Sequence, residues 1–119
     1  MRPHESLEVW QKAVEFVVHI YDRTKQFPSD EKFGLTSQVR RAAVSIPANI
    51  AEGAARTTPK EFRHFVSVAQ GSCSEVETEL LIAEKLGYLS AESYIELKST
   101  ADSIGRMLIG LSKNLKSKE

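Results

Sequence analysis

Two acidic side chains one helical turn apart are the residues of this sequence best suited to metal chemistry. Glu75 and Glu79 are four residues apart, so a helix would place both carboxylates on one face. Carboxylates that project into a helical bundle can hold a metal ion, and Glu52 could face this pair from another helix. The three histidines are scattered without the spacing of metal ligands: His4, His19 and His64. A metal-dependent enzyme is therefore a distant alternative, and we expect no metal or cofactor.

Nucleophilic catalysis has even less support. The chain has a single cysteine, Cys73, which rules out an internal disulfide and is expected to be a small buried side chain in mid-helix. No Ser/His/Asp or Cys/His arrangement and no glycine-rich phosphate loop is recognisable. The sequence thus predicts a protein that is not an enzyme.

A polar stripe is the most unusual feature of the chain. At about 100° per residue, six positions fall within an arc of roughly 80° on one helix. These positions are Gln38, Arg41, Ser45, Asn49, Glu52 and Arg56. Serine and asparagine are poor helix formers, so their place in mid-helix needs a reason. The stripe could be a solvated face, a hydrogen-bonded network between helices or subunits, or a site for a ligand or nucleic acid.

Basic residues form local clusters in a chain that is neutral overall. Sixteen Lys and Arg balance sixteen Asp and Glu, so nucleic acid could bind only through a local patch. The candidate residues for such a patch are Arg40, Arg41, Arg56, Lys60, Arg63, Lys113, Lys116 and Lys118. Each of them could equally be an ordinary solvated charge.

The elements that must position these side chains are four amphipathic helices. Helical periodicity predicts them near residues 6–26, 30–56, 59–86 and 91–116 of one domain spanning 1–119. Short connections favour an all-α, antiparallel up-and-down four-helix bundle. Ser6, Thr58 and Ser90 are expected to cap helices, and Gly87 to end one. Pro47 should kink or split the second helix near Ser45-Ile46.

The first helix carries two apolar stripes, of which a solitary bundle needs only one. One stripe comprises Leu7, Trp10, Val14, Val17 and Tyr21. The other comprises Val9, Ala13, Phe16 and Ile20. We interpret the second stripe as a subunit interface, which predicts a homo-oligomer. The alanine-rich end of the second helix would also allow close approach of another helix.

The sequence resembles a known family. The segments QVRRAAVSIPANIAEGAAR and EFRHFVSVAQGSCSEVETELLIAEKLGYL, with the opening LEVWQKAVEFVVHIYDRTKQFP, look like proteins encoded in intervening sequences of bacterial 23S rRNA genes. SIPANIAEG is the most specific piece. The resemblance implies a four-helix bundle, a pentameric ring and similarity to accessory proteins of diversity-generating retroelements, which bind nucleic acid and are more basic. Positions carried over from the family motif are Gln38, Arg41, Ser45, Asn49, Glu52, Gly53, Ser72 and Glu75.

Together these patterns predict a non-enzymatic, homo-oligomeric protein that binds RNA or an RNA-handling partner. The alternative is a pure protein-interaction scaffold without nucleic acid. No stretch of the sequence approaches the roughly 20 apolar residues of a membrane span, so no membrane association is expected. A cytoplasmic location fits the lone cysteine and the absence of a leader-like segment.

Overall fold

The computed structural model describes all residues from 1 to 119 and contains only helices. Its four α-helices are α1 (Glu8–Thr24), α2 (Leu35–Ala54), α3 (Pro59–Lys85) and α4 (Ala91–Lys116). Two short 3-10 helices, η1 (Pro3–Ser6) and η2 (Ser29–Glu31), precede α1 and α2. The all-helical bundle expected from the sequence is confirmed. None of the helices combines the length and apolar character that a membrane span requires.

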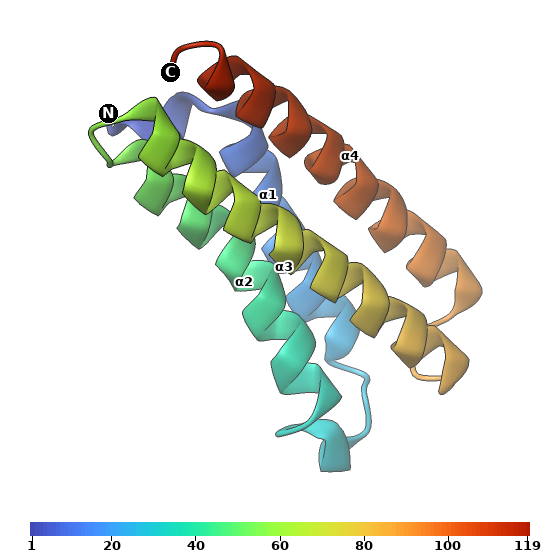
Figure 1. Cartoon of the computed structure of the whole chain (residues 1–119). Helices are drawn as coiled ribbons and strands as arrows, with labels where there is room; N and C mark the ends of the chain where they lie inside the picture. Colours follow the sequence, from blue (N-terminus) through green and yellow to red (C-terminus); the bar gives the residue numbers. More distant parts are fainter.

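Consecutive helices run in opposite directions, so both ends of the chain lie at one end of the bundle (Figure 1). Each helix packs on the next, and α1 also packs on α4, which closes the bundle. The molecule measures 45 × 22 × 21 Å. The long dimension agrees with the length of about 40 Å that a rise of 1.5 Å per residue gives α3.

The core is formed by one apolar stripe from each helix, and this corrects the interface assignment made on α1. Val9, Ala13, Phe16 and Ile20 are at most 5% exposed within their own chain, so they are core residues and not a subunit interface. The other α1 stripe is only partly covered, and its member Tyr21 contacts Arg40 of α2. Leu7, Trp10 and Val17 pack against the core from outside it, whereas Val14 and Tyr21 are exposed.

Several helix ends follow the expected chemistry. The Thr58 hydroxyl accepts a hydrogen bond from the Glu61 amide at 3.1 Å and donates to the Glu61 carboxylate at 3.0 Å. Ser90 caps α4 by accepting from the Ser93 amide at 3.1 Å. Gly87 adopts a φ of 80° just past α3, a conformation that favours glycine.

Other boundaries differ from expectation. Ser6 does not cap α1, because it belongs to η1 and its hydroxyl donates to the Pro3 carbonyl. Helix α1 ends at Thr24 and α2 begins at Leu35, since η2 and turns occupy the intervening residues.

The second helix is not split at Pro47. Helix α2 continues without interruption from Leu35 to Ala54, and Pro47 is buried within it. A proline removes one backbone N–H, but the packing of neighbouring helices can compensate for the lost hydrogen bond. The expected kink remains a prediction.

Candidate functional site

Two members of the polar stripe, Ser45 and Asn49, form a hydrogen-bonded network with Ser72 of α3. The hydroxyl oxygens of Ser45 and Ser72 lie 2.8 Å apart. The Asn49 amide donates to the Ser45 carbonyl at 2.8 Å and to the Ser45 hydroxyl at 2.9 Å. Ser72 also donates to the Val68 carbonyl at 3.2 Å and is only 9% exposed. Here the stripe is structural, because its small polar groups satisfy one another at a helix–helix contact.

The other stripe residues face outward. Gln38, Arg41 and Glu52 are exposed, and Glu52 forms an ion pair with Arg56 at 2.9 Å on the same helix. The Arg56 guanidinium also lies 5.0 Å from the centre of the Phe65 ring on α3. This outer half of the stripe is therefore a solvated face with local charge pairing.

Gly53 lies at a close contact between α2 and α3. A Cβ atom added at Gly53 would lie 2.7 Å from Phe62 Cδ1 and 2.8 Å from Phe65 Cβ. Only a residue without a side chain fits between these rings. Gly53 thus belongs to the internal contact with α3, and not to a smooth outer surface of α2.

The acidic pair on α3 lacks the third carboxylate that the alternative reading as a metal site would require. Glu52 is engaged by Arg56, and no group of three or more His, Cys, Asp or Glu side chains gathers where it could hold a metal. Glu75 forms no ion pair with an arginine of α2. Glu79 is 6% exposed, and its Oε1 atom has no hydrogen-bond partner. Burial, together with a hydrogen bond and repulsion from Glu75, raises the pKa of Glu79 to about 7.

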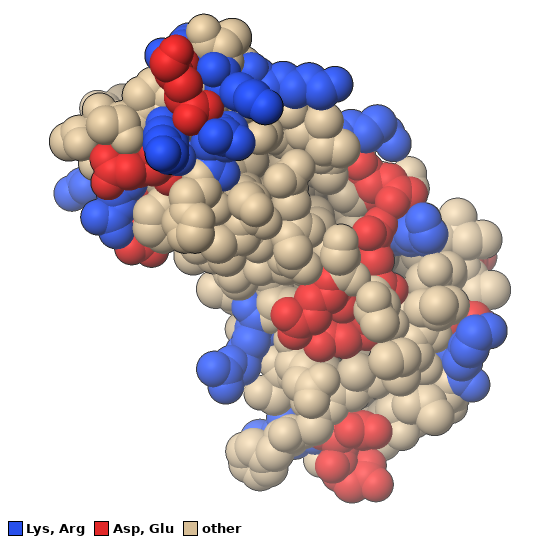
Figure 2. All heavy atoms as spheres, viewed as in Figure 1, with Lys and Arg blue, Asp and Glu red and all other residues tan.

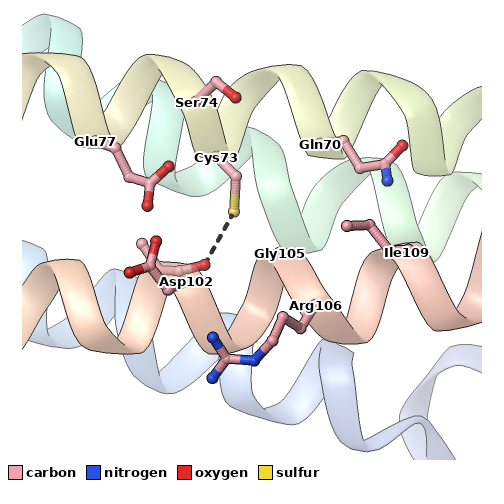
Figure 3. Close-up of a pocket in the computed structure, with 9 residues that line it drawn as sticks. Gln70, Cys73, Ser74, Glu77, Asp102, Gly105, Arg106 and Ile109 are labelled. Atoms are coloured by element: carbon pink, nitrogen blue, oxygen red, sulfur yellow. Dashed lines mark hydrogen bonds between the residues drawn. The ribbon is translucent and has the colours of Figure 1, made fainter.

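A second carboxyl pair lies in an open groove of about 280 Å³ between α3 and α4. Glu77 and Asp102 point toward one another across it (Figure 3). Burial and the neighbouring Asp102 raise the pKa of Glu77 to about 7, whereas hydrogen bonds from Glu77 and Lys98 lower that of Asp102. No local pattern in the sequence points to this pair, because the two residues come from different helices and meet only through the axial register between them.

Cys73 lines the same groove, and its thiol is expected to be unreactive. It is 4% exposed, and its thiol donates to the Ala101 carbonyl at 3.8 Å (Figure 3). Burial raises the pKa of the thiol to about 12, and the charges of Glu77 and Asp102 add to the effect. A thiol of this kind is a poor nucleophile at neutral pH.

The structure separates Arg40 from the other basic residues proposed to contact nucleic acid. Arg40 ties α2 to α1, because its guanidinium donates to the Thr24 hydroxyl at 2.9 Å and the Tyr21 carbonyl at 3.2 Å. It also stacks 4.5 Å from the centre of the Tyr21 ring. Its hydrogen-bonding capacity is therefore largely used inside the fold. Arg41 is exposed in the first half of α2, away from the end of the bundle where α3 begins.

The remaining basic residues gather where α3 begins and α4 ends. We call Lys60, Arg63 and Lys116 the basic end; all three act on the carboxylate of Glu119 and lower its pKa. The exposed Lys113 and Lys118 lie within one turn of Lys116. Figure 2 shows many blue side chains gathered over this end of the molecule with some red ones among them, whereas the largest red cluster lies over the middle. The antiparallel topology thus concentrates positive charge that the neutral composition conceals.

A groove of about 380 Å³ opens at the basic end and is lined only by polar side chains. They are Lys60, Arg63, His64, Ser67, Gln70 and Ser112. Cationic groups and hydroxyl or amide donors are the groups that contact the phosphates and sugars of nucleic acids.

Comparison with known proteins supports the resemblance found in the sequence. The family described as 23S rRNA-intervening sequence protein matches residues 5–110. A crystal structure from Bacteroides thetaiotaomicron, described as a protein with unknown function from the S23 ribosomal protein family, has a TM-score of 0.80 and 26% sequence identity. The similarity covers 88% of this chain and 98% of that chain. No curated protein matches. Because the family match spans most of its length, this chain belongs to the 23S rRNA-intervening sequence protein family.

Proposed function

We propose that this protein is a non-catalytic helical bundle that self-associates and presents its basic end to RNA. The observation that carries the RNA proposal is that Lys60 and Arg63 line a wholly polar groove and that Lys116 joins them in acting on the Glu119 carboxylate. The family is described by an intervening sequence of 23S rRNA, which makes fragments of that RNA the first ligand to test. A neutral chain with one basic end can bind a polyanion in a defined orientation.

Self-association is supported by apolar side chains that the bundle leaves uncovered beside α1 and α2. We define the apolar face as Val14, Val18 and Tyr21 of α1 with Val44 of α2; these side chains are 37–63% exposed. Arg40 stacks on Tyr21, and Val44 and Val18 each follow about one turn further along these two packed helices. A second copy of the chain is the proposed occupant of this face, and the family resemblance suggests five copies. A ring would repeat the basic end several times, so that modest contacts add through multivalency.

A salt series with 23S rRNA fragments in a filter-binding assay tests the RNA proposal. Retention should fall as salt rises, because each phosphate contact releases counterions. Replacing Lys60, Arg63 and Lys116 together by Gln should weaken binding and flatten the dependence on salt. The matched control replaces Lys25, Lys32 and Lys85, which removes the same charge near the opposite end of the bundle.

Two outcomes would overturn the RNA proposal. One is the absence of retention at low salt; the other is equal weakening by the two triple variants. Either would favour the alternative of a protein-interaction scaffold, for which the exposed apolar face already offers a surface.

A further inference from the structure

The guanidinium of Arg63 is already occupied by an anion from the same chain. Its Nε donates to Glu119 Oε2 at 2.7 Å, and its Nη2 donates to Glu119 Oε1 at 3.1 Å. Two parallel hydrogen bonds of this kind are the arrangement in which arginine binds either a carboxylate or a phosphate. The Glu119 side chain is 23% exposed and that of Arg63 is 35% exposed, so solvent reaches this pair only in part.

The surroundings of the pair suit a larger anion than one carboxylate. Lys60 and Lys116 also attract the Glu119 carboxylate, and neither has an ion-pair partner of its own. Hydroxyl and amide groups of Ser67, Gln70 and Ser112 continue the lining of the groove beyond the ion pair. The Glu119 carboxylate therefore pairs with one cation, and the two lysines and the polar groups of the groove stay available to a larger anion.

The segment that delivers Glu119 is suited to detachment. Helix α4 ends at Lys116, and residues 117–119 form an exposed turn stabilised by local hydrogen bonds. An ion pair at the surface, even one that solvent reaches only in part, contributes little to stability, so breaking it costs little free energy. Such a contact can reduce the affinity for a competing anion without abolishing binding.

We propose that Glu119 occupies a phosphate position on Arg63 and acts as an autoinhibitory contact that an RNA phosphodiester must displace. The proposal rests on the function proposed above and adds a regulation of the same site. In this proposal Arg63 contacts the phosphate directly, and Glu119 in the turn after α4 competes with the phosphate for Arg63. No covalent step is involved, since one anion replaces another on the same guanidinium.

A four-variant cycle with a single-stranded RNA oligonucleotide tests the proposal. Glu119→Gln should raise the affinity by about two- to fivefold, which is the range that exposed ion pairs cover. It should also steepen the plot of log affinity against log salt by about one phosphate contact, or roughly 0.7. In the Arg63→Gln background, Glu119→Gln should have a much smaller effect, because the blocked group is gone. Glu15→Gln, which removes an exposed negative charge from α1, is the matched control and should change little.

The outcomes separate the two proposals. RNA binding that is equal in wild type and Glu119→Gln, with the same salt slope, overturns the autoinhibitory contact and leaves the RNA function standing. An equal gain from Glu119→Gln with and without Arg63 also overturns it. If RNA binds none of the proteins, pyrophosphate is titrated into wild type and Glu119→Gln while the Arg63 Nε–H resonance is followed by NMR. A shift that appears at lower pyrophosphate concentration in Glu119→Gln supports the competition while the RNA function fails. No shift in either protein overturns both.

Discussion

The hydroxyl oxygens of Ser45 and Ser72 lie 2.8 Å apart and join α2 to α3 near the middle of the bundle. Each hydroxyl has a further partner on its own helix, Asn49 for Ser45 and the Val68 carbonyl for Ser72. The contact therefore links two local networks across the helix interface. Such coupled groups respond to substitution together.

Single removal of either serine should lower the free energy of unfolding by about 1 kcal/mol, since a partly buried hydroxyl loses its partner. The double variant Ser45→Ala/Ser72→Ala should cost less than the sum of the single changes, because no unpaired hydroxyl is left. Urea denaturation of the four proteins measures the coupling. Strict additivity would show that the two hydroxyls do not interact in solution.

Gly53→Ala should destabilise the protein by about 1–3 kcal/mol, although alanine is the better helix former. The new Cβ would lie 2.7 Å from Phe62 Cδ1 and 2.8 Å from Phe65 Cβ, so α2 and α3 would have to separate. Thermal or urea unfolding followed by circular dichroism measures the change.

Gly71→Ala provides the matched control for this effect. A Cβ at Gly71 meets nothing within 4 Å, so only the helix propensity changes, and stability should rise by up to about 1 kcal/mol. Equal changes at the two glycines would contradict the close approach of the helices at Gly53.

Helical periodicity was enough to predict the bundle, because each of the four helices buries one continuous stripe. It was not enough to orient α1, whose two stripes are both apolar. Whether the stripe with Phe16 or the stripe with Trp10 faces the core depends on where α2 and α4 lie. In the fold, Phe16 is buried, and Arg23 bonds to Glu96 of α4 at 2.8 Å while Arg40 of α2 stacks on Tyr21 on the other side of α1.

The candidate site was predictable to the extent that it follows from topology. An up-and-down bundle brings the start of α3 beside the end of α4, so Lys60 and Lys116 could be expected to meet. The pairing of Ser45 with Ser72 and of Glu77 with Asp102 depends on the axial register between helices, which no local pattern encodes. The contact between Arg63 and Glu119 depends in addition on the turn after α4.

The raised pKa of Glu79 predicts a pH-dependent contribution to stability. In the unfolded chain the group titrates near its ordinary value of 4.5, whereas in the fold its pKa is about 7. The folded state therefore binds the extra proton between these values, and the contribution of Glu79 is lost as pH rises from about 4.5 through 7. Glu79→Gln should raise the free energy of unfolding at pH 8 by on the order of 1 kcal/mol, after allowance for solvent screening, and change it little at pH 4.

Urea unfolding of wild type and Glu79→Gln from pH 4 to pH 8 measures this difference directly. The control Glu15→Gln carries the same chemical change on an exposed part of α1 and should give a flat difference. A constant offset between wild type and Glu79→Gln at every pH would mean that Glu79 titrates normally in the fold.

Val18→Glu should weaken self-association while leaving helicity intact, because Val18 is 63% exposed in the single chain and lies on the apolar face. Burying an unpaired charge between copies costs free energy, so the substitution should destabilise the assembly and not the fold of the single chain. Light scattering for mass and circular dichroism for helicity measure the two consequences.

Two comparisons make the result specific to the apolar face. Ile95→Glu places the same charge on α4 at a residue that is 65% exposed, and it should leave the mass unchanged. Phe16→Glu should instead unfold the chain, since Phe16 is 1% exposed in the core and an ionised carboxylate there has no partner. A wild-type protein that is already monomeric, or loss of mass with Ile95→Glu but not with Val18→Glu, would show that copies do not meet through α1 and α2.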